Sequence, residues 1–156
     1  MQTDVKSKYA TASGLLLPFR TRVKAFFFGA ATTNPGVVGM YDNSFISGTY
    51  ARSTTTATVT AANHNLEVGD SVYLDWDLTD NIYQVVTVAD ANTFTVTVAN
   101  SGAASGNVNV YNDVLVVSKV TTSNDVFNIV PGQGILARTG VRIYLENSVP
   151  VTVYYG

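Results

Sequence analysis

The amino-acid sequence predicts an all-β protein: a small, jelly-roll-like β-sandwich host domain with a small β-barrel or sandwich module inserted in one of its loops. Three observations predict this class. Apolar and polar side chains alternate at every second residue, turn-forming residues separate the alternating stretches, and acidic residues collect in the middle of the chain. No window of eleven residues shows the 3.6-residue period of an amphipathic helix.

Alternation is clearest in SVYLDW (71–76), NTFTVTV (92–98) and VRIYLE (141–146). In the second of these, Phe94, Val96 and Val98 lie on one face and threonines on the other, as a half-buried strand requires. In chain order, strands are predicted at residues 22–28, 37–41, 56–60, 71–76, 83–88, 93–98, 108–111, 114–120, 126–129, 141–146 and 149–155. Turn residues separate them at TTNPG, VADANT, NSGAASGN and VPGQG.

The composition is that of a folded protein without cysteine chemistry. Of 156 residues, 46% are hydrophobic and 13% are charged, against about 25% charged in ordinary soluble domains. With no cysteine, neither a disulfide nor a thiolate metal site can form. MQTDVKSKYATASG has no apolar run of signal-peptide length, and Ala25 to Phe28, the longest run elsewhere, is too short to span a bilayer. We therefore expect no membrane partner.

Charge divides the chain into two parts. Residues 45–111 hold one arginine and six acidic residues, a net charge of −5, whereas the rest holds eight basic and five acidic residues, a net charge of +3. Both boundaries, DNSFISGTY and YNDV, resemble loops. We interpret residues 45–111 as an acidic module inserted into a host made of residues 1–44 and 112–156. A single continuous sandwich is the alternative.

The only histidine, His64, lies in AANHNLEVGD between two predicted strands. A catalytic role would need a Ser or Thr nucleophile and an orienting group, and a metal site would need further His or Cys ligands. We predict instead that His64 caps or bridges turn backbone. Gly69 and Asp70 fit a tight turn, and Leu66 and Val68 are expected to fill one end of the core.

The carboxylates of Asp75, Asp77 and Asp80 are the strongest candidates for metal or catalytic chemistry. Their spacing does not match the calcium-binding loop pattern, and no bidentate Glu follows. A polysaccharide depolymerase would need two of them to converge in a groove. We predict a solvated outer face, no metal or cofactor, and no enzymatic activity.

Several features suggest contact surfaces. VPGQG lacks the Lys-Ser/Thr continuation of a phosphate loop and is predicted to be a turn. RTRVK places Arg20, Arg22 and Lys24 along one face of a strand, alternating with Thr21 and Val23, which suggests either a patch for an acidic partner or nucleic acid, or protection against unwanted strand pairing. Aromatic residues in FFF and in the last strand face both ways, so some must be exposed or covered by a neighbour. The predicted interface is Arg20, Arg22, Lys24, Phe26, Phe27, Phe28, Tyr154 and Tyr155.

Three stretches carry a resemblance. The opening MQTDVKSKYATASG, the strand RTRVKAFFF and the ending VPGQGILARTGVRIYLENSVPVTVYYG resemble a family of small virion-associated structural proteins of marine tailed phages. The match covers roughly the first 44 and last 45 residues. The acidic block, with ATVTAANHNLEVGDSVYLDW and YQVVTVADANTFTV, is similar to a β-module recurrent in phage structural proteins, and the usual short family members lack it.

The resemblance implies a virion protein, assembled in the host cytoplasm. We expect a capsid decoration or cement protein whose host domain docks on the major capsid protein or another virion protein while the acidic module projects. A tail or head-to-tail component is the alternative, as is a glycan- or receptor-binding module with Trp76, Tyr73 and Tyr83 exposed. A host this small favours a homo-oligomer, with a trimer favoured by the threefold positions of shells. The net charge of −2 gives no reason to expect nucleic acid as a partner.

Overall fold

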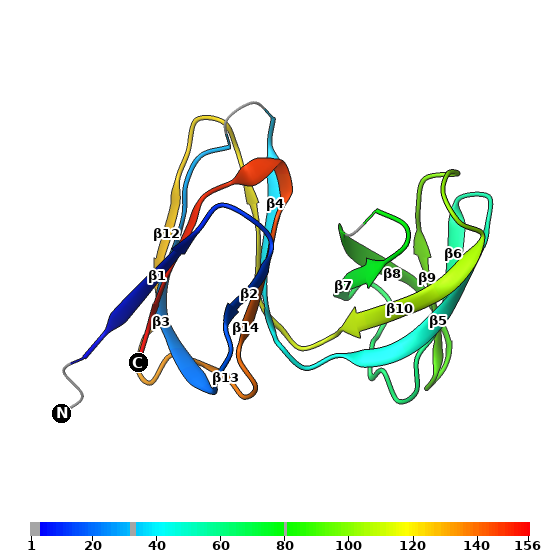
Figure 1. Ribbon diagram of the computed structural model, residues 1–156, viewed down its shortest axis with the longest axis horizontal. Coiled ribbons are helices and arrows are strands. Elements are labelled where there is room, and N and C mark those ends of the chain that lie inside the picture. The colour runs from blue at the N-terminus through cyan, green and yellow to red at the C-terminus, as the bar shows by residue number, and fades with distance from the viewer. Residues whose placement is uncertain (1–3, 32–33, 80) are drawn as a thin grey trace. The chain divides into compact units, whose positions relative to one another are not determined.

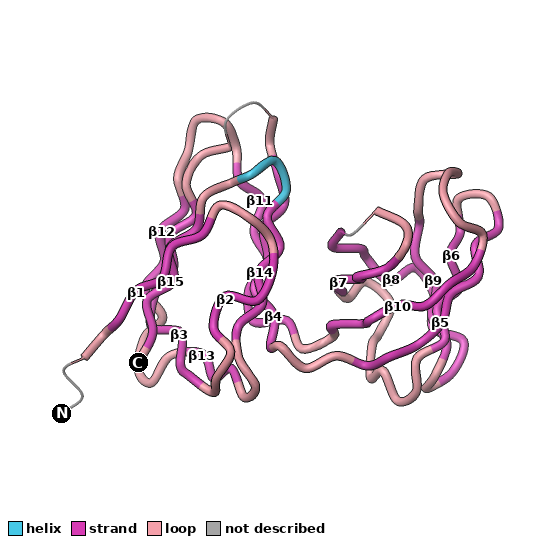
Figure 2. The backbone as a smooth tube through the Cα atoms, in the orientation of Figure 1, coloured by secondary structure: helices cyan, strands magenta, loops and turns pink. Residues whose placement is uncertain are grey.

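The computed structural model describes residues 4–31, 34–79 and 81–156, and strands dominate it, as Figures 1 and 2 show. The chain forms two compact units. Unit 1 comprises Met1–Asn43 and Leu115–Gly156, and unit 2 is Ser44–Val114. The predicted module, residues 45–111, lies within unit 2. The predicted all-β class is confirmed.

One layer of unit 1 is a five-stranded sheet, called sheet A here. Four of its strands lie in the order β1-β15-β3-β12, and the fifth, β13, also pairs with β3. All pairs are antiparallel. The bounds are β1 (Lys6–Ala10), β3 (Thr21–Phe28), β12 (Val126–Ile129), β13 (Ile135–Ala137) and β15 (Val151–Tyr155).

The second layer, sheet B, has the order β11-β4-β14-β2. Its strands are β2 (Gly14–Leu17), β4 (Gly36–Asp42), β11 (Val114–Val120) and β14 (Val141–Leu145). A short 3₁₀ turn, Glu146–Ser148, leads from β14 toward β15. Between the two sheets lies one apolar core that includes Leu17, Phe26, Phe28, Met40 and Ile143. Unit 1 is therefore a β-sandwich.

Unit 2 is a closed barrel in which the strands follow the order β10-β5-β6-β9-β8-β7. The bounds are β5 (Ile46–Ser53), β6 (Thr56–Thr60), β7 (Ser71–Trp76), β8 (Asn81–Asp90), β9 (Thr93–Thr97) and β10 (Ser105–Tyr111). The inward-facing residues form a second core, which includes Leu66, Leu74, Trp76, Phe94 and Val96. Closure leaves the six strands without a free edge.

Four strands were not predicted: β1, β2, β5 and β13. The stretch DNSFISGTY, interpreted as a loop, contains most of β5, and β10 begins inside NSGAASGN, interpreted as a turn. Val68 is 67% exposed, so the prediction that it fills one end of the core is wrong, whereas Leu66 is 6% exposed and does so. No helix of the described residues is long and apolar enough to cross a membrane.

Candidate interaction surface

The outer face of sheet A carries aromatic side chains in register across four strands. Tyr9 pairs with Thr152, Thr152 pairs with Phe27, and Phe27 pairs with Phe127. Because paired residues point to the same side of a sheet, these four side chains form one row. Their inward neighbours on β3, Phe26 and Phe28, lie in the core, so this row faces away from it.

A second row lies beside the first. Ser7 pairs with Tyr154, Tyr154 with Ala25, and Ala25 with Ile129. The rings of Phe127 and Tyr154 meet edge to face, with centroids 6.3 Å apart. The two rows therefore place aromatic and aliphatic groups side by side on one surface.

The apolar and aromatic members of these two rows, together with Val5, form what we call the apolar patch. It contains a depression of about 260 Å³ lined by Val5, Lys24, Ala25, Phe127, Ile129 and Tyr154. Ile129 is 72% exposed, and Phe127 is 55% exposed. Large apolar side chains grouped at this exposure are typical of a surface that another molecule covers.

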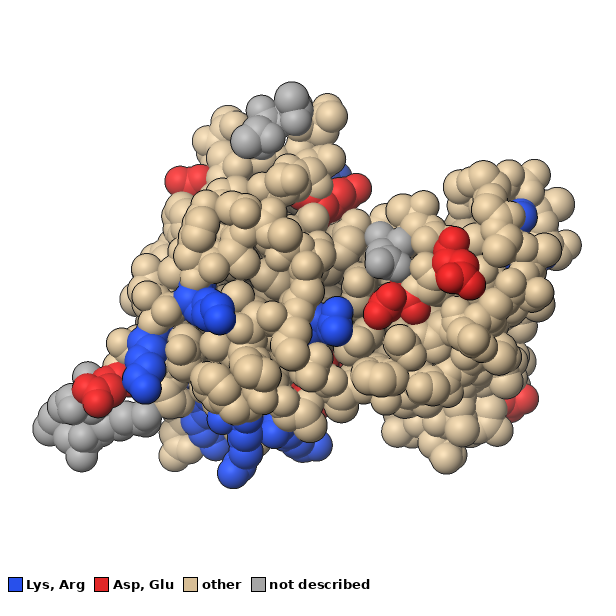
Figure 3. All heavy atoms as spheres, viewed as in Figure 1, with Lys and Arg blue, Asp and Glu red and all other residues tan. Residues whose placement is uncertain are grey.

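Basic side chains occupy the end of the same face where β3 begins, and we call Arg20, Arg22 and Lys24 the basic end. Thr21 and Val23 are buried, so the basic residues point the other way, as the alternation in RTRVK predicted. Tyr155 pairs with Val23 and Tyr154 with Ala25, a register shift that leaves Lys24 as an extra residue beside the apolar patch. Figure 3 shows a compact group of Lys and Arg side chains on unit 1.

The turn in VPGQG positions two of these cations. A nitrogen of the Arg22 guanidinium, Nη1, donates to the Gly134 carbonyl at 3.4 Å, and Lys24 Nζ donates to the Gln133 carbonyl at 2.9 Å. Gly134 has a φ of +80°, and a side chain there would collide with the backbone of β3. VPGQG is therefore a turn, as predicted, and it presents carbonyls to cations where a phosphate loop would present amides.

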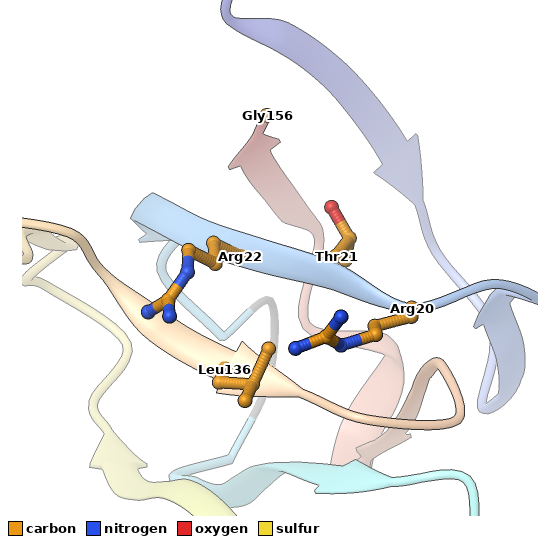
Figure 4. A pocket seen from close by; sticks show the side chains of 5 residues that line it. All are labelled: Arg20, Thr21, Arg22, Leu136 and Gly156. Carbon is orange, nitrogen blue, oxygen red and sulfur yellow. The ribbon is translucent and has the colours of Figure 1, made fainter.

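A second depression, of about 240 Å³, lies at the basic end and is lined by Arg20, Thr21, Arg22, Leu136 and Gly156. Figure 4 shows both guanidinium groups extending beside Leu136 of β13. Arg22 and Leu136 are register partners, which fixes the leucine next to the arginine stem. Two guanidinium forks beside a hydrocarbon surface are suited to a carboxylate, a sulfate or a phosphate.

The structure corrects two of the interface predictions. Phe26 is 5% exposed and Phe28 is fully buried, and both pack in the core of unit 1, with ring centroids 5.0 Å apart. They are therefore unavailable to a partner. The suggestion that the basic residues protect a free strand edge is also wrong, because β3 pairs with β15 on one side and with β12 and β13 on the other.

The other predicted aromatic residues divide between the two faces. Phe27 and Tyr154 lie on the outer face of sheet A and are half-buried. Tyr155 packs against the core and against the ring of Phe19, at a centroid distance of 5.9 Å. Of the eight predicted residues, Arg20, Arg22, Lys24, Phe27 and Tyr154 thus share the outer face.

Sequence reasoning missed Phe127 and Ile129, which are 55% and 72% exposed on this surface. A signal was present, because the predicted strand 126–129 places both on one face. That face was not recognised as solvent-exposed, since the alternation does not say which side of an edge strand meets the core. Tyr9 was missed because β1 itself was not predicted.

His64 is 1% exposed and bridges turn backbone, which confirms the predicted role. Its Nδ1 accepts from the amide of Leu66 at 3.0 Å, and its Nε2 lies 3.2 Å from the carbonyl oxygen of Asp90. An amide facing Nδ1 and a carbonyl facing Nε2 require the neutral ring with its proton on Nε2. The ring also meets Phe94 edge to face at 5.0 Å.

The adjoining turn follows the predicted chemistry. The Glu67 amide donates to Asp70 Oδ2 at 2.8 Å, and the Asp70 amide donates to the Glu67 carbonyl at 3.1 Å. Gly69 between them has a φ of +94°, a conformation that favours glycine. The turn leaves Val68 at its exposed tip.

The three candidate carboxylates have different surroundings. Asp77 is exposed and Asp75 is half-buried, which corrects the expectation that both are fully solvated. Asp80 lies outside the described residues. Within the described ranges, no group of three or more His, Cys, Asp or Glu side chains is arranged to hold a metal ion.

The aromatic residues proposed for a glycan platform are tied into unit 2. Trp76 is 8% exposed and Tyr73 is 4% exposed. Trp76 Nε1 and the Tyr83 hydroxyl both donate to the Thr79 carbonyl, at 3.1 Å and 2.6 Å. Trp76 thus offers no open ring face for a sugar, and the expectation that it and Tyr73 are exposed is wrong.

Tyr50 carries a buried hydroxyl that has no hydrogen-bond partner among the described residues. Burial raises the pKa of Tyr50 above 10.0, and the nearby Asp77 carboxylate raises that pKa further, whereas Arg52 acts in the opposite direction. Gly106 leaves room for the Asp77 carboxylate and the Tyr50 ring beside it. A β-carbon on Gly106 would lie 2.8 Å from Asp77 Oδ2 and 3.2 Å from the Tyr50 hydroxyl.

Comparison with known proteins finds no matching family model, no matching curated protein and no matching solved structure.

Proposed function

We propose that this chain is a structural protein of a phage particle, a capsid decoration or cement protein. Unit 1 docks on the major capsid protein or another virion protein, and the acidic unit 2 projects. The chain is assembled into the virion in the host cytoplasm. The observation that carries the proposal is the apolar patch, where Phe127 and Ile129 remain more than half exposed.

Two further observations support a docking role. The outer face of sheet A belongs to the part of the chain whose motifs resemble virion-associated proteins. The face also combines apolar and basic groups, the mixture of a buried centre and a charged rim that protein interfaces use. The net charge of −5 on residues 45–111 suits a surface that must stay soluble at high local concentration.

The test is a reconstruction of the whole virion at a resolution that traces side chains. We expect density for this chain on the shell, with the outer face of sheet A against a shell protein. Density on the tail or at the head-to-tail junction would replace decoration with a tail or connector role. Absence of the chain from purified particles would overturn the proposal.

A further inference from the structure

The two depressions lie on one sheet face and share one strand. Arg22 faces outward from β3 at the basic end, and Ala25 and Phe27 face outward farther along the same strand. Since a strand rises about 3.3 Å per residue, Arg22 and Ala25 are roughly 10 Å apart along it. Lys24 lines the apolar depression and stands between the two ends.

In the part of the chain that the structure describes, two side chains of the basic end hydrogen-bond to backbone carbonyls and not to carboxylates. Arg22 and Lys24 donate to backbone carbonyls of residues 133 and 134, which are neutral acceptors. Arg20 is exposed beside them. Three cations spaced along a few residues of one strand repel each other, and an anionic group over Arg20 and Arg22 would relieve that repulsion.

The apolar end narrows the class of ligand. A carboxylate, sulfate or phosphate satisfies the arginines, but the depression among Phe127, Ile129 and Tyr154 has almost wholly apolar walls. A sulfated sugar has no aliphatic side chain to place there while its anions occupy the basic end, and nucleic acid would offer only the faces and methyl groups of its bases. A protein segment carries both kinds of side chain at strand spacing.

We propose that the outer face of sheet A binds an acidic, partly apolar segment of another virion protein, with apolar side chains over Phe127 and Ile129 and a carboxylate over Arg20 and Arg22. This inference rests on the proposed function and names the chemistry of the docking partner. Charge complementarity selects the partner: the segment is acidic because the face that receives it is basic.

The experiment adds purified chain to particles assembled without it and measures binding by co-sedimentation. Arg20→Glu is compared with Lys119→Glu, which makes the same charge change at an exposed position of β11 in sheet B. Ile129→Asp is compared with Val86→Asp, a similar change at a 48% exposed valine of unit 2. Circular dichroism checks that all four variants are folded.

We expect Arg20→Glu and Ile129→Asp each to weaken binding about tenfold or more, and the two controls to bind like wild type. Raising the salt concentration from about 0.05 M to about 0.5 M shortens the Debye length. It should therefore weaken particle binding by the wild type and have a smaller effect on binding by Arg20→Glu. Wild-type binding by both test variants would overturn this inference alone. Failure of the wild-type chain to bind, together with its absence from natural particles, would overturn the proposed function as well.

Two other occupants give distinct results. Sedimentation velocity would reveal a second copy of the chain as the occupant if both test variants turned an oligomer into a monomer while particle binding persisted. Duplex DNA would be the occupant if the chain bound it and Arg20→Glu abolished that binding while Ile129→Asp did not. Either result would overturn the inference.

Discussion

Buried polar side chains in both units bind backbone groups. Asp42, 1% exposed, accepts from the amides of Arg138 and Thr139 and from the Thr139 hydroxyl, and so joins the end of β4 to the segment before β14. His64 does the equivalent in unit 2 between Leu66 and Asp90. These residues have the chemistry of active sites, but their hydrogen bonds are structural.

Replacing His64 by alanine should therefore destabilise unit 2. The change leaves the buried Leu66 amide without its acceptor and opens a cavity beside Phe94, which together should lower the free energy of unfolding by about 3 kcal/mol. Trp76, the only tryptophan and a member of the barrel core, reports unfolding in urea by its fluorescence. Val68→Ala, at an exposed position in the same segment, should change stability by less than about 0.5 kcal/mol. Equal unfolding midpoints for His64→Ala and wild type would contradict the structural role.

Tyr50 should make unit 2 sensitive to alkali. Its pKa is raised in the folded state, so above about pH 10 the unfolded chain loses the proton first, and stability falls as the pH rises. One such group contributes a slope of up to about 1.4 kcal/mol per pH unit. Tyr50→Phe should reduce the slope measured by urea unfolding between pH 9 and 11.

The same variant gives a second check at neutral pH. Because the Tyr50 hydroxyl has no partner among the described residues, Tyr50→Phe should be neutral or slightly stabilising at pH 7. Tyr83→Phe is the matched comparison, since it removes the bond to the Thr79 carbonyl and should lower stability. A Tyr50→Phe protein less stable than wild type at pH 7 would show that the hydroxyl has a partner.

Strands with one apolar face were predictable from the sequence, and strands without one were not. Ser71–Trp76, Val114–Val120 and Val126–Ile129 were predicted with their observed bounds. Strand β1, KSKYA, has exposed side chains along almost its whole length because it lies at a sheet edge. Strand β5, ISGTYARS, turns Gly48 and Arg52 to the same side as Tyr50, which dilutes its apolar pattern.

The interaction surface was predictable only in part for a related reason. Alternation assigned Phe26, Phe27 and Phe28 to two faces, but only the pairing of β3 inside sheet A shows that Phe27 is the outward one. Likewise, Phe127 and Tyr154 are distant in sequence, and their contact depends on both strands flanking β3. Information of this kind is in the topology and not in any single stretch.

Strand β5 also carries a position that should not tolerate a side chain. A β-carbon on Gly48 would collide with the backbone carbonyl oxygen of Thr60 on β6, which cannot move without breaking the β5–β6 pairing. Gly48→Val should destabilise unit 2 by more than about 2 kcal/mol in Trp76-monitored urea unfolding. Thr49→Val, on the exposed side of the same strand, should have little effect. A fully stable Gly48→Val protein would show that the barrel can open at this pairing.

For the whole molecule, the central question is whether unit 1 folds without unit 2. Each unit has its own apolar core, and the cost of closing a loop grows only slowly with its length. We predict that replacing residues 45–111 by a short Gly-Ser linker leaves a folded sandwich that still binds the particle. Circular dichroism and a cooperative urea transition measure this. A product that is unfolded even when expressed with its partners would favour one continuous folding unit.

Unit 1 has features that favour assembly into an oligomer. A sandwich of fewer than 90 residues has a modest core, and among the described strands β1 and β12 lie at the two edges of sheet A. We predict a homo-oligomer, with a trimer favoured. Light scattering after size exclusion measures the mass, and a strictly monomeric chain at the concentrations found on a particle would contradict the prediction.

The pairing between the first and last strands of the barrel has a consequence for gene exchange. Strands β5 and β10, which begin and end unit 2, are antiparallel neighbours, and Ile46 pairs directly with Val110. The two points where the chain enters and leaves the barrel are therefore about 5 Å apart, the width of a single strand pair. Because its two ends are this close, a unit of this kind can be inserted into a surface loop of another protein without separating the two residues that the loop connects. Recombination that transfers the gene segment encoding the unit would then exchange it between genomes.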